Sequence, residues 1–163
     1  MRANRSFAVC VAAVTATSCS FIVGTGFNEC ANDTQCASDK ACLKNYCIPM
    51  PETCRRESGV FDDPTRIPIA AALPLSSGGI DGGVDDSEVS GLNAMKLAID
   101  EVNVRGINNR KIGFYVCNTG REKPRIANQV DWLTDELDAK AVLFSGSSQG
   151  IAATLPARKQ SIL

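Results

Sequence analysis

Continuous apolar runs recur along the chain from residue 67 onward, and each is followed by a polar or glycine-rich stretch. Three such runs cover residues 67–73, 111–116 and 141–144. A strand that is buried on both faces has this pattern, because neither set of alternating side chains meets water. The sequence therefore predicts three buried strands, the first of which ends at Pro74.

Between these runs, apolar residues recur every three or four positions, which predicts two helices, at about 88–104 and 123–139. Ser87 is the expected N-cap of the first helix, and Gly106 is its expected stop. Each helix has one apolar face, made of Leu92, Met95, Ile99 and Val102 in the first and of Ile126, Val130, Leu133 and Leu137 in the second.

Further along, residues 151–160 and 161–163 predict a third helix and the opening of a fourth strand. Such alternation predicts a parallel sheet with helices on both faces, a three-layer αβα fold. Ligands of such sheets bind beyond the carboxyl ends of the strands. Two loops rich in glycine and serine lie there, and their hydroxyls are the candidate ligand contacts: Ser76, Ser77, Ser147 and Ser148. The alternative is that both loops are turns of small residues without a ligand.

Residues 1–18 have the layout of a secretory signal peptide. Arg2 and Arg5 precede an uncharged apolar run of about ten residues, which is too short to span a bilayer. Small residues lead up to Cys19 as in a bacterial lipobox, with Ala16 standing where leucine is usual. We expect lipidation of Cys19, with plain secretion as the alternative. The expected protein is secreted or periplasmic and lipid-anchored to a bacterial membrane.

Residues 19–54 form a cysteine-rich module that is too short to fold on apolar burial alone, so disulfides are expected to stabilise it. Zinc is the competing interpretation, but zinc ribbons use close C-x2-C pairs and the segment has none, so no metal is expected. Fifteen pairings are open to the six cysteines Cys30, Cys36, Cys42, Cys47, Cys54 and Cys117. Since the module holds an odd number of them, one must pair outside it, and we suspect a Cys54–Cys117 bond.

Composition and charge narrow the function further. The chain of 163 residues has a formal charge of −1 and no histidine. The near-zero charge gives no electrostatic footprint for nucleic acid, and the missing histidine removes imidazole metal sites and histidine-dependent catalysis. We expect no cofactor. Residues 55–66 are polar and contain glycine and proline, which predicts a linker between the module and an α/β part at 67–163.

Several ordered motifs in the α/β part carry a family resemblance. They lie at residues 69–76, 91–103, 106–112 and 142–148. In this order they resemble the first lobe of the type I periplasmic binding proteins, with the Leu/Ile/Val-binding branch the most similar. A cysteine-rich module ahead of such a domain is similar to substrate-binding lipoproteins of some Gram-negative bacteria.

The resemblance implies an extracytoplasmic receptor that closes on an amino acid or a similar small polar solute and serves an ABC-type uptake or sensing system, with an ABC permease as partner. Ser147 and Ser148 match the family's loop that holds the charged end of the ligand. The family cysteine after the second strand matches Cys117, but its usual partner is absent at Gly146, which supports Cys54 instead. A full receptor has a second lobe, so the resemblance implies an incomplete first lobe, and we expect a truncated form that exposes the flank of its third strand and aggregates.

Two other functions stay open at this point. The G-x-S-x-G pattern at residues 146–150 is typical of serine hydrolases, with Ser148 as the nucleophile, but a triad needs a base and the chain has no histidine. The other possibility is a cysteine-rich secreted or surface lipoprotein whose α/β part is a non-binding remnant. We expect a binding protein and not an enzyme.

Overall fold

The computed structural model describes residues 29–76, 83–120 and 123–145. The expected signal peptide, the lipidation site Cys19, the third helix and the fourth strand lie outside these residues. Ser77, Ser147 and Ser148 also lie outside them. The fold is therefore established from the cysteine-rich segment through the third predicted strand.

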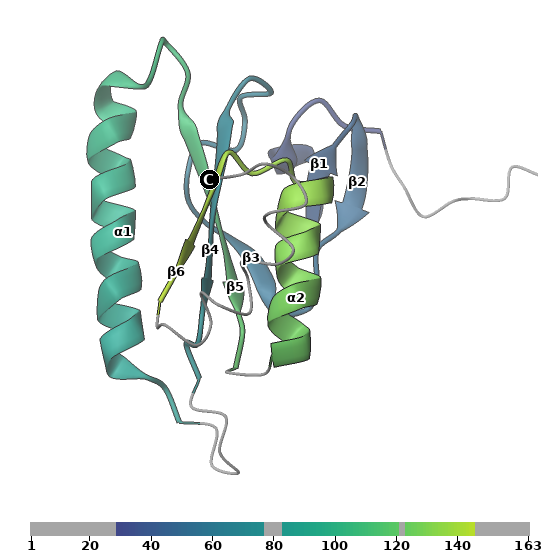
Figure 1. Ribbon diagram of the computed structural model, residues 1–163. Coiled ribbons are helices and arrows are strands. Elements are labelled where there is room, and N and C mark those ends of the chain that lie inside the picture. Colours follow the sequence, from purple (N-terminus) through teal and green to yellow (C-terminus); the bar gives the residue numbers. More distant parts are fainter. Residues whose placement is uncertain (1–28, 77–82, 121–122, 146–163) are drawn as a thin grey trace, which may run out of the picture.

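A four-stranded sheet forms the middle layer of the molecule (Figure 1). Its order is β3 (Cys54–Gly59), β5 (Ile112–Asn118), β4 (Ile67–Leu73) and β6 (Ala141–Phe144). The strand β4 pairs in parallel with both β5 and β6, as the sequence predicts. All three predicted strands therefore form, and the second extends as far as Asn118.

The remaining strand of the sheet, β3, begins at Cys54 and continues into the segment 55–66 that was expected to be a linker, so residues 55–59 form a strand instead. β3 runs antiparallel to β5, which makes the sheet mixed rather than wholly parallel. At its end, Gly59 has φ of +98°, and an added Cβ would lie 2.2 Å from the carbonyl oxygen of Ile112. An edge strand forms hydrogen bonds with a neighbour along one edge only, and its two faces are only partly covered by other elements. Its side chains therefore need not form a continuous apolar run. The polar residues of β3 therefore show no strand pattern in the sequence.

Helices cover both faces of the sheet, as predicted (Figure 1). α1 (Asp86–Arg105) packs on one face, and α2 (Lys123–Asp131) lies on the other and continues into a π-helical turn, η2 (Trp132–Glu136). The predicted apolar face of the second helix is buried throughout, at Ile126, Val130, Leu133 and Leu137. Because β4–α1–β5 and β5–α2–β6 cross on opposite faces, the described part is a doubly wound α/β arrangement.

The first helix differs from the prediction at its start and on one face. Asp85 rather than Ser87 is the N-cap, and it accepts a hydrogen bond from the Glu88 backbone N–H at 3.4 Å. Val102, expected on the buried face, is 39% exposed. Its neighbour Asn103 faces the sheet instead and bonds to both backbone groups of Ile112, where β5 begins. The helix therefore ends with a polar clamp to the sheet.

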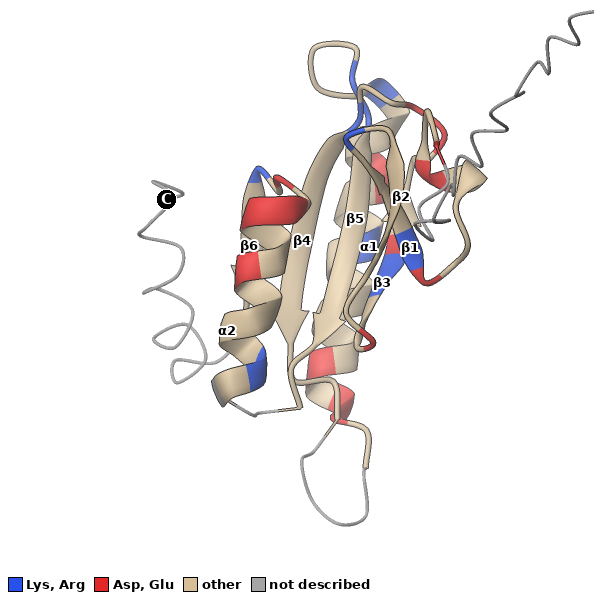
Figure 2. Cartoon of the chain, turned by 90° about the vertical axis from the view of Figure 1, so that its right-hand side faces the viewer, with Lys and Arg blue, Asp and Glu red and all other residues tan. Residues whose placement is uncertain are grey.

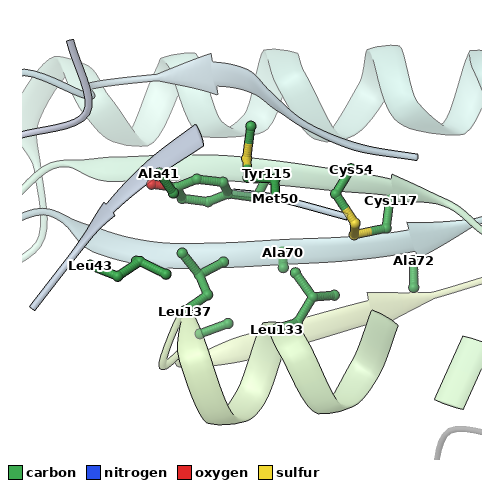
Figure 3. Packing of buried hydrophobic residues seen from close by; sticks show 11 residues of the cluster. Ala41, Leu43, Met50, Cys54, Ala70, Ala72, Tyr115, Cys117, Leu133 and Leu137 are labelled. Atoms are coloured by element: carbon green, nitrogen blue, oxygen red, sulfur yellow. A yellow bond between two sulfur atoms is a disulfide. The ribbon is translucent and has the colours of Figure 1, made fainter. Parts of the chain in front are cut away.

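The cysteine-rich segment packs on the sheet and shares its core, so it is not a separate module. Its hairpin of β1 (Lys40–Leu43) and β2 (Tyr46–Pro49) lies beside α2 on the same side of the sheet (Figure 1). Figure 3 shows side chains from the hairpin region, the sheet and the second helical segment in one cluster, among them Ala41, Leu43, Met50, Ala70, Ala72, Leu133 and Leu137. The hairpin thus covers sheet surface that α2 leaves open.

All six cysteines that were expected to pair do so. Two interleaved bonds, Cys30–Cys42 and Cys36–Cys47, cross-link the hairpin and the short helix η1 (Asp33–Gln35). The third bond joins Cys54 of β3 to Cys117 of β5, which confirms that prediction. Three cysteine sulfurs lie within 4.8 Å of one another, but all three belong to disulfides and offer no thiolate to a metal.

A buried carboxylate ties this segment to the sheet. Asp33 is fully buried, and its Oδ2 lies 2.8 Å from Arg66 Nη2 and accepts a hydrogen bond from the Tyr115 hydroxyl. Its Oδ1 accepts from the backbone N–H of Cys42. Burial raises the pKa of Tyr115 far above its usual range, and the charge of Asp33 raises it further. The network joins residues that are far apart in the chain and so fixes the segment on the sheet.

Candidate functional site

The order of the strands places a switch point between β4 and β6. From β4 the chain crosses to β5 on one side and then returns to β6 on the other side. In open α/β sheets, ligands bind in the crevice at such a point, beyond the carboxyl ends of the strands. Three polar residues mark these ends here: Ser76 after β4, Asn118 at the end of β5, and Ser145 after β6. They are the candidate site.

Ser76 and Asn118 lie side by side at this edge. Asn118 Nδ2 donates to Ser76 Oγ at 3.1 Å, and Asn118 Oδ1 accepts from the backbone N–H of Gly120 at 3.1 Å. Ser76 also forms an isolated β-bridge with Val84, just before α1. The hydroxyl is half-buried and oriented by these contacts, and Ser76 lies at the carboxyl ends of the strands, where open α/β sheets bind ligands.

Ser145 differs from Ser76 because no group in the described part of the chain forms a hydrogen bond with its hydroxyl. Its Oγ is buried and finds no hydrogen-bond partner among the described residues. A buried hydroxyl without a partner is unfavourable, and native proteins resolve it with a water molecule or a ligand. Ser145 directly follows β6, which is only partly buried, and a serine at the end of a predicted strand was the available signal in the sequence.

The two helices that begin at this edge carry opposite charge. α1 starts with Asp86 and Glu88 behind the N-cap Asp85, and Figure 2 shows these acidic residues gathered at that end of the helix. The first turn of α2 carries Arg125, whose Nη1 would lie 2.8 Å from a Cβ added to Gly120. A solute at the edge therefore meets carboxylates on one side and a guanidinium on the other.

A second hollow opens where the turn before β3 meets α2. Two adjoining clefts of 390 and 450 Å³ share Glu52, Thr53 and Arg125 in their walls. Gln129 lines the first cleft, and Asn118 lines the second. This hollow was not predicted from the sequence. Its one signal was a glutamine on the buried face of a helix, three positions after Ile126 and four before Leu133.

Gln129 is 2% exposed and is held by its amide nitrogen. Nε2 donates to Thr53 Oγ1 and, at 3.0 Å, to the carbonyl oxygen of Asn118. Since Nε2 faces two oxygens, the orientation of the amide is determined, and Oε1 is the acceptor that points elsewhere. This Oε1 is buried and has no partner among the described residues.

Of the predicted ligand-binding residues, the structure places Ser76 alone, at the switch-point edge. Ser77, Ser147, Ser148 and the G-x-S-x-G segment lie outside the described residues. Within the described ranges no helix has both the length and the apolar character needed to cross a membrane. Comparisons of the chain with protein-family models, with curated proteins and with solved structures give no match.

Proposed function

We propose that this protein is the extracytoplasmic solute-binding component of an ABC-type uptake or sensing system, and that it binds an amino acid or a similar small polar molecule. The observation that carries the proposal is the Ser145 hydroxyl, which is buried at the switch point of a doubly wound sheet and has no hydrogen-bond partner among the described residues. A binding role without catalysis accords with a chain that has no histidine. An ABC permease is the proposed partner.

The charges at the edge support a solute with an amino group. The carboxylates of Asp86 and Glu88 favour a cationic group near the start of α1, while the serine hydroxyls can donate hydrogen bonds to a carboxylate. The three disulfides require an oxidising compartment. Together with the signal-like N-terminus, they support a location outside the cytoplasm, with a lipid anchor at Cys19.

Thermal unfolding of the oxidised chain in the presence of each standard L-amino acid tests the proposal. A ligand at one hundred times its Kd stabilises the folded state by about 2.7 kcal/mol, which raises Tm by roughly 5 to 10 °C in a domain of this size. Uniform Tm values across the whole set would contradict solute binding. A cooperative transition that no solute shifts would favour the alternative, a surface lipoprotein with a non-binding remnant.

Ser145→Ala then locates the binding site. Because its hydroxyl has no hydrogen-bond partner within residues 29–76, 83–120 and 123–145, its removal should leave the stability of the unliganded protein unchanged or slightly raised. The same change should reduce the ligand-induced rise in Tm. Ser38→Ala is the matched control, since Ser38 is an exposed serine in the turn before β1. An equal ligand-induced rise in Tm in both variants would show that Ser145 does not contribute to the site.

A further inference from the structure

We propose that the cleft between the 51–53 turn and α2 is a second binding site, which takes a carboxylate that carries a neighbouring N–H donor. The free amino acid and the carboxyl-terminal residue of a peptide share this chemistry. The site uses neither Ser76 nor Ser145, although the cleft borders the switch-point edge at Asn118 and Arg125.

The first argument is the unsatisfied acceptor in the wall. Gln129 is almost fully buried, and both of its Nε2 contacts hold the amide against Thr53 and the end of β5. Its Oε1 is left as a buried carbonyl oxygen to which no group of the described residues donates. A carbonyl oxygen only accepts hydrogen bonds, so a group that completes this site must bring an N–H or O–H.

The second argument is the charge that the cleft presents. Arg125 lies in the wall of both adjoining clefts, and a guanidinium binds carboxylates with paired N–H donors. Glu52 contributes the opposite charge in the same walls. A ligand with a carboxylate for Arg125 and an N–H for Gln129 Oε1 therefore matches what the protein offers.

The third argument is how the cleft is built. Its outer wall is Pro51–Thr53, which connects the cysteine-rich hairpin to β3, and its inner wall is α2. The Cys54–Cys117 bond joins the end of this turn to β5, next to Asn118. The turn is thus held covalently on β5, and Gln129 of α2 donates hydrogen bonds to Thr53 of the same turn and to Asn118 of β5. The cleft is therefore formed before any ligand arrives, and little ordering is required on binding.

Calorimetric titration of the oxidised chain with matched ligands tests the proposal without altering the protein. N-acetylalanine has both groups, N-acetylproline lacks the N–H, and N-acetylalaninamide lacks the carboxylate. We expect N-acetylalanine to bind at least about tenfold more tightly than either of the other two, the ratio typical of one lost charged or buried hydrogen bond. Equal binding of N-acetylproline, or no binding of N-acetylalanine, would overturn the proposal.

Variants of the cleft residues show which side chains bind the ligand, and whether a free amino acid or a ligand without an ammonium group is preferred. Arg125→Gln should weaken N-acetylalanine about tenfold or more, whereas Arg105→Gln, an exposed arginine at the end of α1, should not. Glu52→Gln should weaken free alanine, whose ammonium it attracts, and strengthen N-acetylalanine. Undiminished binding to Arg125→Gln would refute the assignment. Ser145→Ala should leave the binding of N-acetylalanine unchanged. A failure of the switch-point site can therefore be distinguished from a failure of the cleft site.

Discussion

The disulfide between Cys54 and Cys117 should contribute more to stability than either bond of the hairpin. It closes a loop of 63 residues, while Cys30–Cys42 closes one of 12. A cross-link stabilises mainly by restricting the unfolded chain, and the effect grows with the logarithm of loop length. The chain-entropy relation gives about 4 kcal/mol for the long loop and about 3 kcal/mol for the short one.

The perturbation is the double variant Cys54→Ala/Cys117→Ala, compared with Cys30→Ala/Cys42→Ala. Both cysteines of the long-range bond are buried in the main apolar cluster, so lost packing adds to the entropic loss. The free energy of unfolding of a native protein is about 5 to 15 kcal/mol in total. Cys54→Ala/Cys117→Ala should therefore lose a large part of its stability.

Urea unfolding followed by circular dichroism measures both changes. The first variant should show a lower free energy of unfolding and a larger m value, since its unfolded chain exposes more surface when the loop is open. The hairpin variant serves as the control for removing a disulfide as such. A loss below about 1 kcal/mol for Cys54→Ala/Cys117→Ala, or one smaller than that of the hairpin variant, would refute the loop-length argument.

Three further predictions concern the polar contacts of the core. The raised pKa of Tyr115 means that the folded state keeps the phenol proton longer than the unfolded state, so stability should be fully present below about pH 10 and fall by roughly 1 kcal/mol per pH unit above it. Absorbance titration of Tyr46→Phe, in which Tyr115 is the remaining tyrosine, checks this, and ionisation near pH 10 would contradict it. Asp33→Ala should lose about 3 to 5 kcal/mol in urea unfolding, because it leaves Arg66 charged and buried without its carboxylate, and a loss under 1 kcal/mol would argue against the buried pair. Asn103→Ala should lose about 1 to 3 kcal/mol and speed amide hydrogen exchange at the start of β5, whereas unchanged exchange would argue against the clamp.

Much of the fold follows from local patterning. The sequence predicted the bounds of β4 and β6 and the apolar face of the second helical segment residue by residue. The reason is that apolar side chains are buried only when their spacing in the sequence matches the period of the helix or strand. The odd number of cysteines in the module indicated that Cys117 pairs with one of them, but that this partner is Cys54 was a hypothesis that the structure confirms. The parallel pairing of β4 with its neighbours followed from the alternation of strands and helices.

What the sequence left undecided is the set of polar residues that become buried. β3 has no apolar run, and it is a strand because β5 offers it an edge. Asp33 looks like a turn residue, yet it is fully buried, because Arg66 and Tyr115 arrive from distant segments to meet its charge. Gln129 is likewise defined by its contacts with Thr53 and the end of β5. A polar group is buried only where partners compensate for its lost water, and those partners are brought together by the tertiary structure rather than by the neighbouring sequence.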